Sequence, residues 1–205
     1  MFMYCMILTT RSTFGIGLLV EGVVLIAAFG FGFLAGLPPF GSFALDPAAL
    51  AIGVAATAPP LMALAAFARA RPAFFSSIER AILAALGPWL RDAPGWQLVA
   101  LAAVAGLAEE GLFRGVLQVG AAGIVGVAPA IVLCGVAFGL AHAVTPGYAV
   151  YAAAMGVYLG IVMALTGNIA VPALVHGLYD AAALGFMRER ARSVSPVTET
   201  HGPMP

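Results

Sequence analysis

The sequence predicts an all-α, polytopic transmembrane helical bundle of about six spans, with one further helix at the cytoplasmic interface. Hydrophobic residues make up 62% of the 205 residues and charged residues only 9%, whereas soluble domains are about 45–50% apolar. Apolar runs of about 20 residues, the length that a helix needs to cross the hydrocarbon core, recur along the chain. The formal net charge is zero, so nothing in the composition indicates a nucleic-acid partner.

Six apolar runs are long enough to be interpreted as spans. The second contains Pro59-Pro60, which predicts a kink or break, because prolines inside a helix remove backbone donors and clash with the preceding turn. A glycine-rich link is expected between the third and fourth runs, and turns are expected at Thr145-Pro146-Gly147 and at Gly167-Asn168. The predicted spans cover residues 14–36, 47–67, 96–118, 127–144, 148–165 and 169–187.

The connection over residues 69–95 is the one long polar segment between spans. Its middle, residues 76–90, carries Ile and Leu at helical spacing, which predicts an amphipathic interfacial helix. With six spans, this connection and both chain ends share one side, and the arginines gathered there predict that this side is cytoplasmic. The composition, rich in Ala, Gly and Pro and without Lys, is typical of a GC-rich bacterial gene. We therefore expect a multi-pass protein of the bacterial cytoplasmic (inner) membrane, with both termini in the cytoplasm.

We expect one transmembrane domain over residues 1–187, with its chemistry-bearing part at 96–187 and a polar cytoplasmic tail at 188–205. The two cysteines, Cys5 and Cys134, are far apart and give neither a disulfide framework nor a zinc-type spacing. The first span carries a single acid, Glu21, which we expect to face the bundle or the interface without a catalytic role.

Three charges fall within six residues of the third span, at Glu109, Glu110 and Arg114. A charge at the depth of the bilayer core costs at least about 2.5–3.5 kcal/mol, so ionisable residues there are rare and usually functional. Glu110 and Arg114 are four residues apart and can form an ion pair on one helix face. Glu109 points about 100° away from that face and is free to reach a cavity.

Two later spans each carry a further polar pair at helical spacing. Phe138 and His142 share a face of the fourth span, and His176 and Asp180 share a face of the sixth. Glu109 and His142 are nearly equidistant from the link near residue 124, so antiparallel packing of their spans would set them level.

A carboxylate, two imidazoles and a second carboxyl form a set suited to hydrolysis. The carboxylate can take a proton from water, and a histidine can relay it or donate to a developing oxyanion. The same types of ligand would suit zinc at Glu109, His142 and His176. These ligands lack the paired spacing of a metalloprotease helix, so we expect no resident metal. The motifs His-Glu-x-x-His and Gly-x-Gly-Asp are absent, and no serine lies in the histidine-bearing spans.

The motifs Glu-Glu-x-x-x-Arg, Phe-x-x-x-His and His-x-x-x-Asp, in this order on successive spans, resemble the three signatures of the CPBP family. This family contains the CAAX prenyl endoproteases and bacteriocin-processing (ABI) proteins. The resemblance implies an intramembrane peptidase without a cofactor, in which Glu109 activates water with His142. It also implies that His176 and Asp180 bind the oxyanion, and that Glu110 and Arg114 hold their helix in register. The prenyl proteases carry Asn where this chain has Asp180, so the role at that position is open.

The expected partners are a peptide or membrane-protein substrate and the lipid bilayer. Two other functions are compatible with the same motifs. The chain could be a non-catalytic binding or immunity protein on the same fold, although it retains every expected catalytic position. It could also be a small proton-coupled transporter, which requires a polar path open to both sides. The first two spans offer only Glu21 for such a path.

Overall fold

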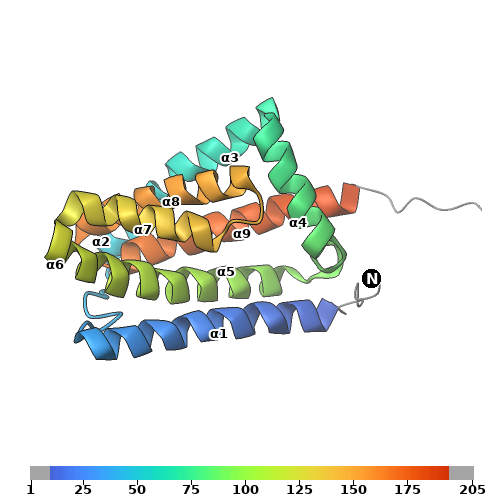
Figure 1. The fold of residues 1–205 in the computed structure, drawn as a ribbon. Helices are drawn as coiled ribbons and strands as arrows, with labels where there is room; N and C mark the ends of the chain where they lie inside the picture. The colour runs from blue at the N-terminus through green and yellow to red at the C-terminus, as the bar shows by residue number, and fades with distance from the viewer. Residues whose placement is uncertain (1–9, 194–205) are drawn as a thin grey trace, which may run out of the picture.

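The computed structural model describes residues 10–193, and every regular element in that range is a helix (Figure 1). The predicted all-α bundle is therefore confirmed. The elements in chain order are α1 (Thr10–Ala35), α2 (Pro47–Ala56), α3 (Ala58–Ala70), α4 (Ala73–Asp92), α5 (Gly95–Glu110), the π-helix η1 (Gly111–Gln118), α6 (Val119–Val125), α7 (Val127–Ala141), α8 (Pro146–Thr166) and α9 (Ala170–Ser193).

Five helical stretches within the described residues are long and apolar enough to cross a membrane. The helix α7, predicted as a span over 127–144, has only 15 residues. At 1.5 Å per residue it is about 22 Å long, which is short of the roughly 30 Å hydrocarbon core. The predicted total of six spans therefore stays a prediction. The five long stretches are Thr13–Ala35, Pro47–Ala70, Gly95–Val125, Pro146–Thr166 and Ala170–Ser193.

The break predicted at Pro59-Pro60 occurs two residues earlier, at Thr57, which separates α2 from α3. The Thr57 hydroxyl donates to the Gly53 carbonyl at 2.8 Å and satisfies that end of α2. Both prolines then lie in the first turn of α3, where a missing backbone N–H costs little.

Two segments that the sequence analysis predicted to be irregular are helical. The expected glycine-rich link after residue 118 continues as α6, and only Gly126, with φ of 86°, interrupts the path into α7. The expected polar tail from residue 188 continues α9 as far as Ser193. In an apolar environment a backbone has no water to bond to, so a helix that satisfies its own N–H and C=O groups is favoured over an open link. The rest of that tail, 194–205, and residues 1–9 lie outside the described range.

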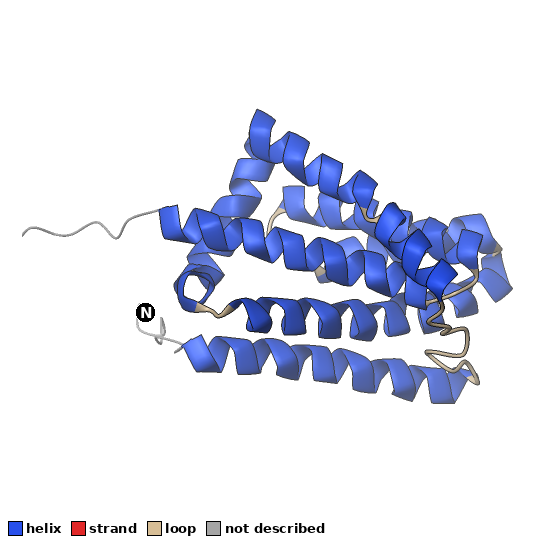
Figure 2. Cartoon of the chain, turned by 180° about the vertical axis from the view of Figure 1, so that it is seen from behind, coloured by secondary structure: helices blue, strands red, loops and turns tan. Residues whose placement is uncertain are grey.

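Three long helices, α1, α5 and α9, run along the length of the bundle, and α7 packs as a hairpin on α8 (Figure 1). Seen from behind, the loops are short except for the one joining α1 to α2, residues 36–46 (Figure 2). Glycines allow the closest approaches. A Cβ on Gly106 of α5 would lie 2.7 Å from the Ala173 carbonyl oxygen of α9, and one on Gly156 of α8 would lie 2.9 Å from Gly135 Cα of α7.

The helix α4 crosses one end of the bundle, the end at which α1 begins and α9 finishes (Figure 1). It contains the segment predicted as an amphipathic helix and turns that apolar face inward, with Ile78 buried and Ile82 packed on neighbouring helices. The buried Glu79 holds α4 in place, because its carboxylate lies 2.7 Å from Arg190 of α9 and 3.3 Å from Arg71. The location of α4 at the membrane interface stays a prediction.

Candidate active site

The ring of Phe138 lies at the centre of the polar residues that the sequence singled out. The His142 ring stacks on it with centroids 4.4 Å apart, and the His176 ring meets its edge at 5.7 Å. The Arg114 guanidinium lies 4.9 Å from the centroid of the same ring. A cation over an aromatic face is stabilised by the ring quadrupole, so Phe138 holds two imidazoles and one cation in fixed positions.

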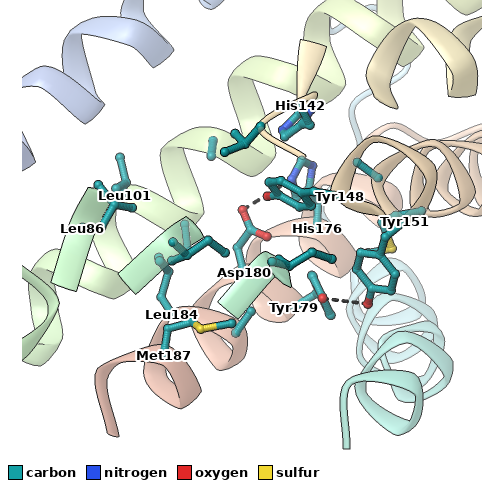
Figure 3. Close-up of a pocket in the computed structure, with 18 of the residues that line it drawn as sticks. Leu86, Leu101, His142, Tyr148, Tyr151, His176, Tyr179, Asp180, Leu184 and Met187 are labelled. Atoms are coloured by element: carbon teal, nitrogen blue, oxygen red, sulfur yellow. Dashed lines mark hydrogen bonds and ion pairs between the residues drawn. The ribbon is translucent and has the colours of Figure 1, made fainter. Parts of the chain in front are cut away.

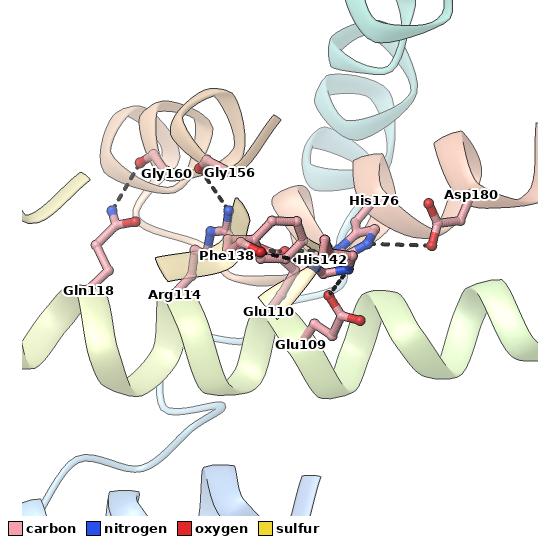
Figure 4. A network of polar contacts seen from close by, with 10 residues as sticks. All are labelled: Glu109, Glu110, Arg114, Gln118, Phe138, His142, Gly156, Gly160, His176 and Asp180. Atoms are coloured by element: carbon pink, nitrogen blue, oxygen red, sulfur yellow. Dashed lines mark hydrogen bonds and ion pairs between the residues drawn. The ribbon is translucent and has the colours of Figure 1, made fainter. Parts of the chain in front are cut away.

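The guanidinium of Arg114 is fully buried and ties η1 to two other parts of the site (Figure 4). One nitrogen, Nη1, donates to Glu110 Oε1 at 2.9 Å, and Nη2 donates to the Gly156 carbonyl of α8 at 2.7 Å. One turn further along, Gln118 donates to the Gly160 carbonyl at 3.0 Å. The π-helix and α8 are therefore joined by two successive side chain–backbone bonds.

The histidine His176 lies between two carboxyl groups. Its Nδ1 is 2.9 Å from Glu110 Oε1, and its Nε2 is 3.5 Å from Asp180 Oδ2 (Figure 4). Because Glu110 Oε1 accepts from Arg114, we assign it as an acceptor for His176 also, with Nδ1–H of His176 donating to it. A carboxylate bonded to Nδ1 fixes the tautomer and orientation of an imidazole. The predicted Glu110–Arg114 ion pair is present, and Glu110 in addition orients His176.

The side chains of Glu109 and His142 approach each other from different helices. His142 follows the last residue of α7, and its Nδ1 lies 2.8 Å from the Phe138 carbonyl oxygen. A carbonyl only accepts, so Nδ1 carries the proton and a neutral ring presents its Nε2 lone pair. That Nε2 lies 3.6 Å from Glu109 Oε2, and the two side chains are 24% and 12% exposed. Glu109 and His142 therefore lie at the same level of the bundle, as expected from their spacing.

A cavity of about 510 Å³ opens at these residues (Figure 3). Its walls come from α1, α3, α4, α5, α7, α8 and α9, and most of them are apolar. The polar lining comprises Glu21, Glu109, His142, His176, Asp180 and three tyrosines, Tyr148, Tyr151 and Tyr179. The Tyr151 and Tyr179 hydroxyls bond each other at 2.7 Å. Such a mainly apolar pocket with a few convergent polar groups is typical of a binding or catalytic site.

The alternative zinc set of Glu109, His142 and His176 is not assembled as a metal centre. Both ring nitrogens of His176 face carboxylates, at 2.9 Å and 3.5 Å. Within residues 10–193, no group of three His, Cys, Asp or Glu side chains is arranged to hold a metal ion. The donors present therefore do not fit zinc in this arrangement.

Residues 91–182 match the family model described as Type II CAAX prenyl endopeptidase Rce1-like. The resemblance to the CPBP family is thereby confirmed over this segment. The matched CPBP segment contains all seven site residues that the sequence analysis named. No curated protein and no solved structure matches the chain significantly. Together with the long apolar helices, the match supports a multi-pass membrane protein and a CAAX-type intramembrane protease.

Two features of the site were missed by the sequence analysis. The cavity is lined by Glu21 of α1, which lies outside the CPBP segment, and by Tyr148 of α8, whose ring meets His142 at 6.0 Å. An acid in an apolar span was a usable signal for Glu21. For Tyr148 there was no such signal, because an aromatic residue near a span end is ordinary.

Proposed function

We propose that the protein is an intramembrane endopeptidase of CPBP type, in which Glu109 and His142 activate a water molecule that attacks a peptide bond. The observation that carries this proposal is the approach of Glu109 Oε2 to His142 Nε2 at 3.6 Å inside an apolar cavity. Neither atom faces a competing cation, so both can act as proton acceptors.

The separation of these two atoms suits a shared water. A water about 2.8 Å from each of them would subtend an angle of roughly 80° across the 3.6 Å gap. Its two protons would then point at the two acceptors, which leaves an oxygen lone pair for the substrate carbonyl. A positioned general base of this kind contributes about 10²- to 10⁴-fold.

The proton balance of the reaction needs only this chain and water. As the water oxygen bonds to the carbonyl carbon, its proton passes to Glu109 and the carbonyl oxygen becomes an oxyanion. When the carbonyl re-forms, the C–N bond breaks and Glu109 returns the proton to the departing amine. The surrounding apolar walls strengthen each electrostatic contact, because little water screens it.

In this proposal Asp180 and His176 form the oxyanion site, and one of the two donates to the oxyanion. His176 lies 3.5 Å from Asp180 Oδ2, and an ionised Asp180 would oppose a second negative charge. Two arrangements remove this conflict: Asp180 is protonated and donates, or it is ionised and His176 donates as an imidazolium. We favour the protonated acid, since the related prenyl proteases use an amide at this position.

Loss of the base tests the proposal directly. In a nonionic detergent, the purified protein is incubated with a pool of apolar, quenched fluorogenic peptides, and Glu109→Gln is compared with the wild type. Gln keeps the shape and removes the base, so turnover should fall by at least about 10²-fold. The matched control is Glu189→Gln, which removes an exposed acid, 66% exposed, on α9.

Four outcomes are decisive. Cleavage lost in Glu109→Gln and kept in the control supports the peptidase. Cleavage at the wild-type rate by a folded Glu109→Gln protein rules out this mechanism. A folded wild type that binds peptides and cleaves none favours the binding-protein alternative, and proton flux through reconstituted vesicles would favour the transporter.

A further inference from the structure

One carboxyl oxygen of Glu21 is buried without a partner among the described residues. It is 9% exposed, and its Oε2 has no hydrogen-bond partner among the described residues. It lines the same cavity as Glu109 and Asp180. A buried carboxyl that finds no protein partner is costly, since it loses its hydration and gains nothing in return. The group is therefore placed to meet something that enters the cavity.

The packing of α1 on α5 sets the distance of Glu21 from the proposed catalytic base. The two helices run in the same direction (Figure 1), and Gly17 faces Leu101, where an added Cβ would lie 3.0 Å from a leucine methyl. Glu21 is four residues beyond Gly17 on the same face, level with residue 105. Glu109 is one further turn along α5. The axial separation is therefore about 6 Å, at 1.5 Å per residue.

The described lining of the cavity has no arginine or lysine side chain to neutralise this charge. Three carboxyl side chains line it, and no arginine does, among the residues that the structure describes. The chain has no lysine. The nearby Arg114 does not line the cavity and is bonded to Glu110 and Gly156. An incoming positive charge would meet three carboxyl groups in the described lining and, apart from the two histidines, only uncharged groups, whereas these carboxyl groups would oppose an incoming carboxylate.

We infer that Glu21 forms a specificity subsite for a basic side chain of the substrate, about two residues from the scissile bond. An extended peptide advances about 3.3 Å per residue, so two residues running along the helix axes cover the axial offset of about 6 Å between Glu109 and Glu21. The remaining walls are apolar and accept apolar neighbours. The substrate class is therefore an apolar, membrane-associated segment carrying one Lys or Arg close to the cleavage point. This inference rests on the proposed function for the position of the scissile bond.

A binding measurement with an inactive variant tests the subsite independently of cleavage. The probes are capped, dye-labelled apolar dodecapeptides with Arg, Gln or Glu two residues to either side of the central bond. Affinity is measured by fluorescence anisotropy in a nonionic detergent with Glu109→Gln protein, which cannot turn over the probe. The same measurement is made with Glu21→Gln added, and with Glu189→Gln added as the control for an exposed acid.

At least one Arg probe should bind about tenfold or more tightly than its Gln twin, the scale of one charge-assisted hydrogen bond. The Glu probe should bind more weakly than the Gln twin. Adding Glu21→Gln should abolish the preference, whereas adding Glu189→Gln should leave it intact.

Equal binding of the Arg, Gln and Glu probes to the Glu109→Gln protein, in which Glu21 is intact, overturns the inference. A preference that survives Glu21→Gln overturns it as well. Neither result affects the proposed function, which depends on cleavage by the wild type. Conversely, a charge preference that depends on Glu21, together with a wild-type protein that cleaves no peptide, supports the subsite and rejects the peptidase.

Discussion

Replacing Glu110 by Gln should destabilise the fold more than replacing Arg114 by Gln, because the residues left behind keep different partners. Both side chains are fully buried, and Glu110 Oε1 lies 2.9 Å from Arg114 Nη1 and from His176 Nδ1. With Gln at position 110, Arg114 loses its only ion-pair partner among the described residues and keeps only neutral acceptors such as the Gly156 carbonyl. Without Arg114, Glu110 keeps His176 and can share its proton.

The expected magnitudes follow from these partners. Stranding a buried charge costs about 3–5 kcal/mol, which is the predicted loss of unfolding free energy for Glu110→Gln. Arg114→Gln loses hydrogen bonds but strands no unpaired charge, so about 1–3 kcal/mol is expected. The double variant removes both charges. It should be at least about 2 kcal/mol more stable than the sum of the single effects, within the range of contacting pairs.

The double-mutant cycle is measured by denaturant titration in a nonionic detergent, with far-UV circular dichroism as the probe. The exposed pair of Glu189 and Arg192, 3.4 Å apart, is the control, and Glu189→Gln should cost less than about 1 kcal/mol. A Glu110→Gln protein as stable as this control would refute the reasoning. So would a double variant whose loss equals the sum of the two single losses.

Three further predictions concern the catalytic chemistry and the helix packing. If Asp180 is a neutral donor, Asp180→Asn should keep cleavage activity, and the decline of the cleavage rate toward higher pH should become shallower. A pH–rate profile of the variant uniformly far below wild type would show instead that a charged Asp180 orients His176. Gly139→Ala should cost about 1–3 kcal/mol and lower activity, because its Cβ would lie 2.9 Å from the backbone nitrogen of Ala153; Gly185→Ala, with no atom within 4 Å of its Cβ, should not destabilise the protein in the same titration. Elemental analysis should find no stoichiometric zinc, since both nitrogens of His176 face carboxylates; one zinc per chain, with activity lost on its removal and regained on its return, would contradict this.

The properties that could be predicted from the sequence are local ones. Hydrophobicity over about 20 residues decides whether a helix can be buried in lipid, so the all-α bundle follows from composition and run length. Two prolines cannot both lie in a helix interior without kinking or breaking it, and the break beside Pro59 follows from this. Spacing of four residues places two side chains on one face, which is why the pair of Glu110 and Arg114 could be predicted.

Contacts between helices were decided only by the tertiary structure. Whether Glu110 reaches His176, or Glu21 reaches the cavity, depends on the rotation and axial shift of one helix against another. Those variables are set by close approaches such as Gly106 against Ala173 and Gly17 against Leu101. An apolar span is hydrophobic on every face, so its sequence does not mark the face that meets a neighbour. Helix packing determines which faces are in contact, and therefore which partner each buried charge has.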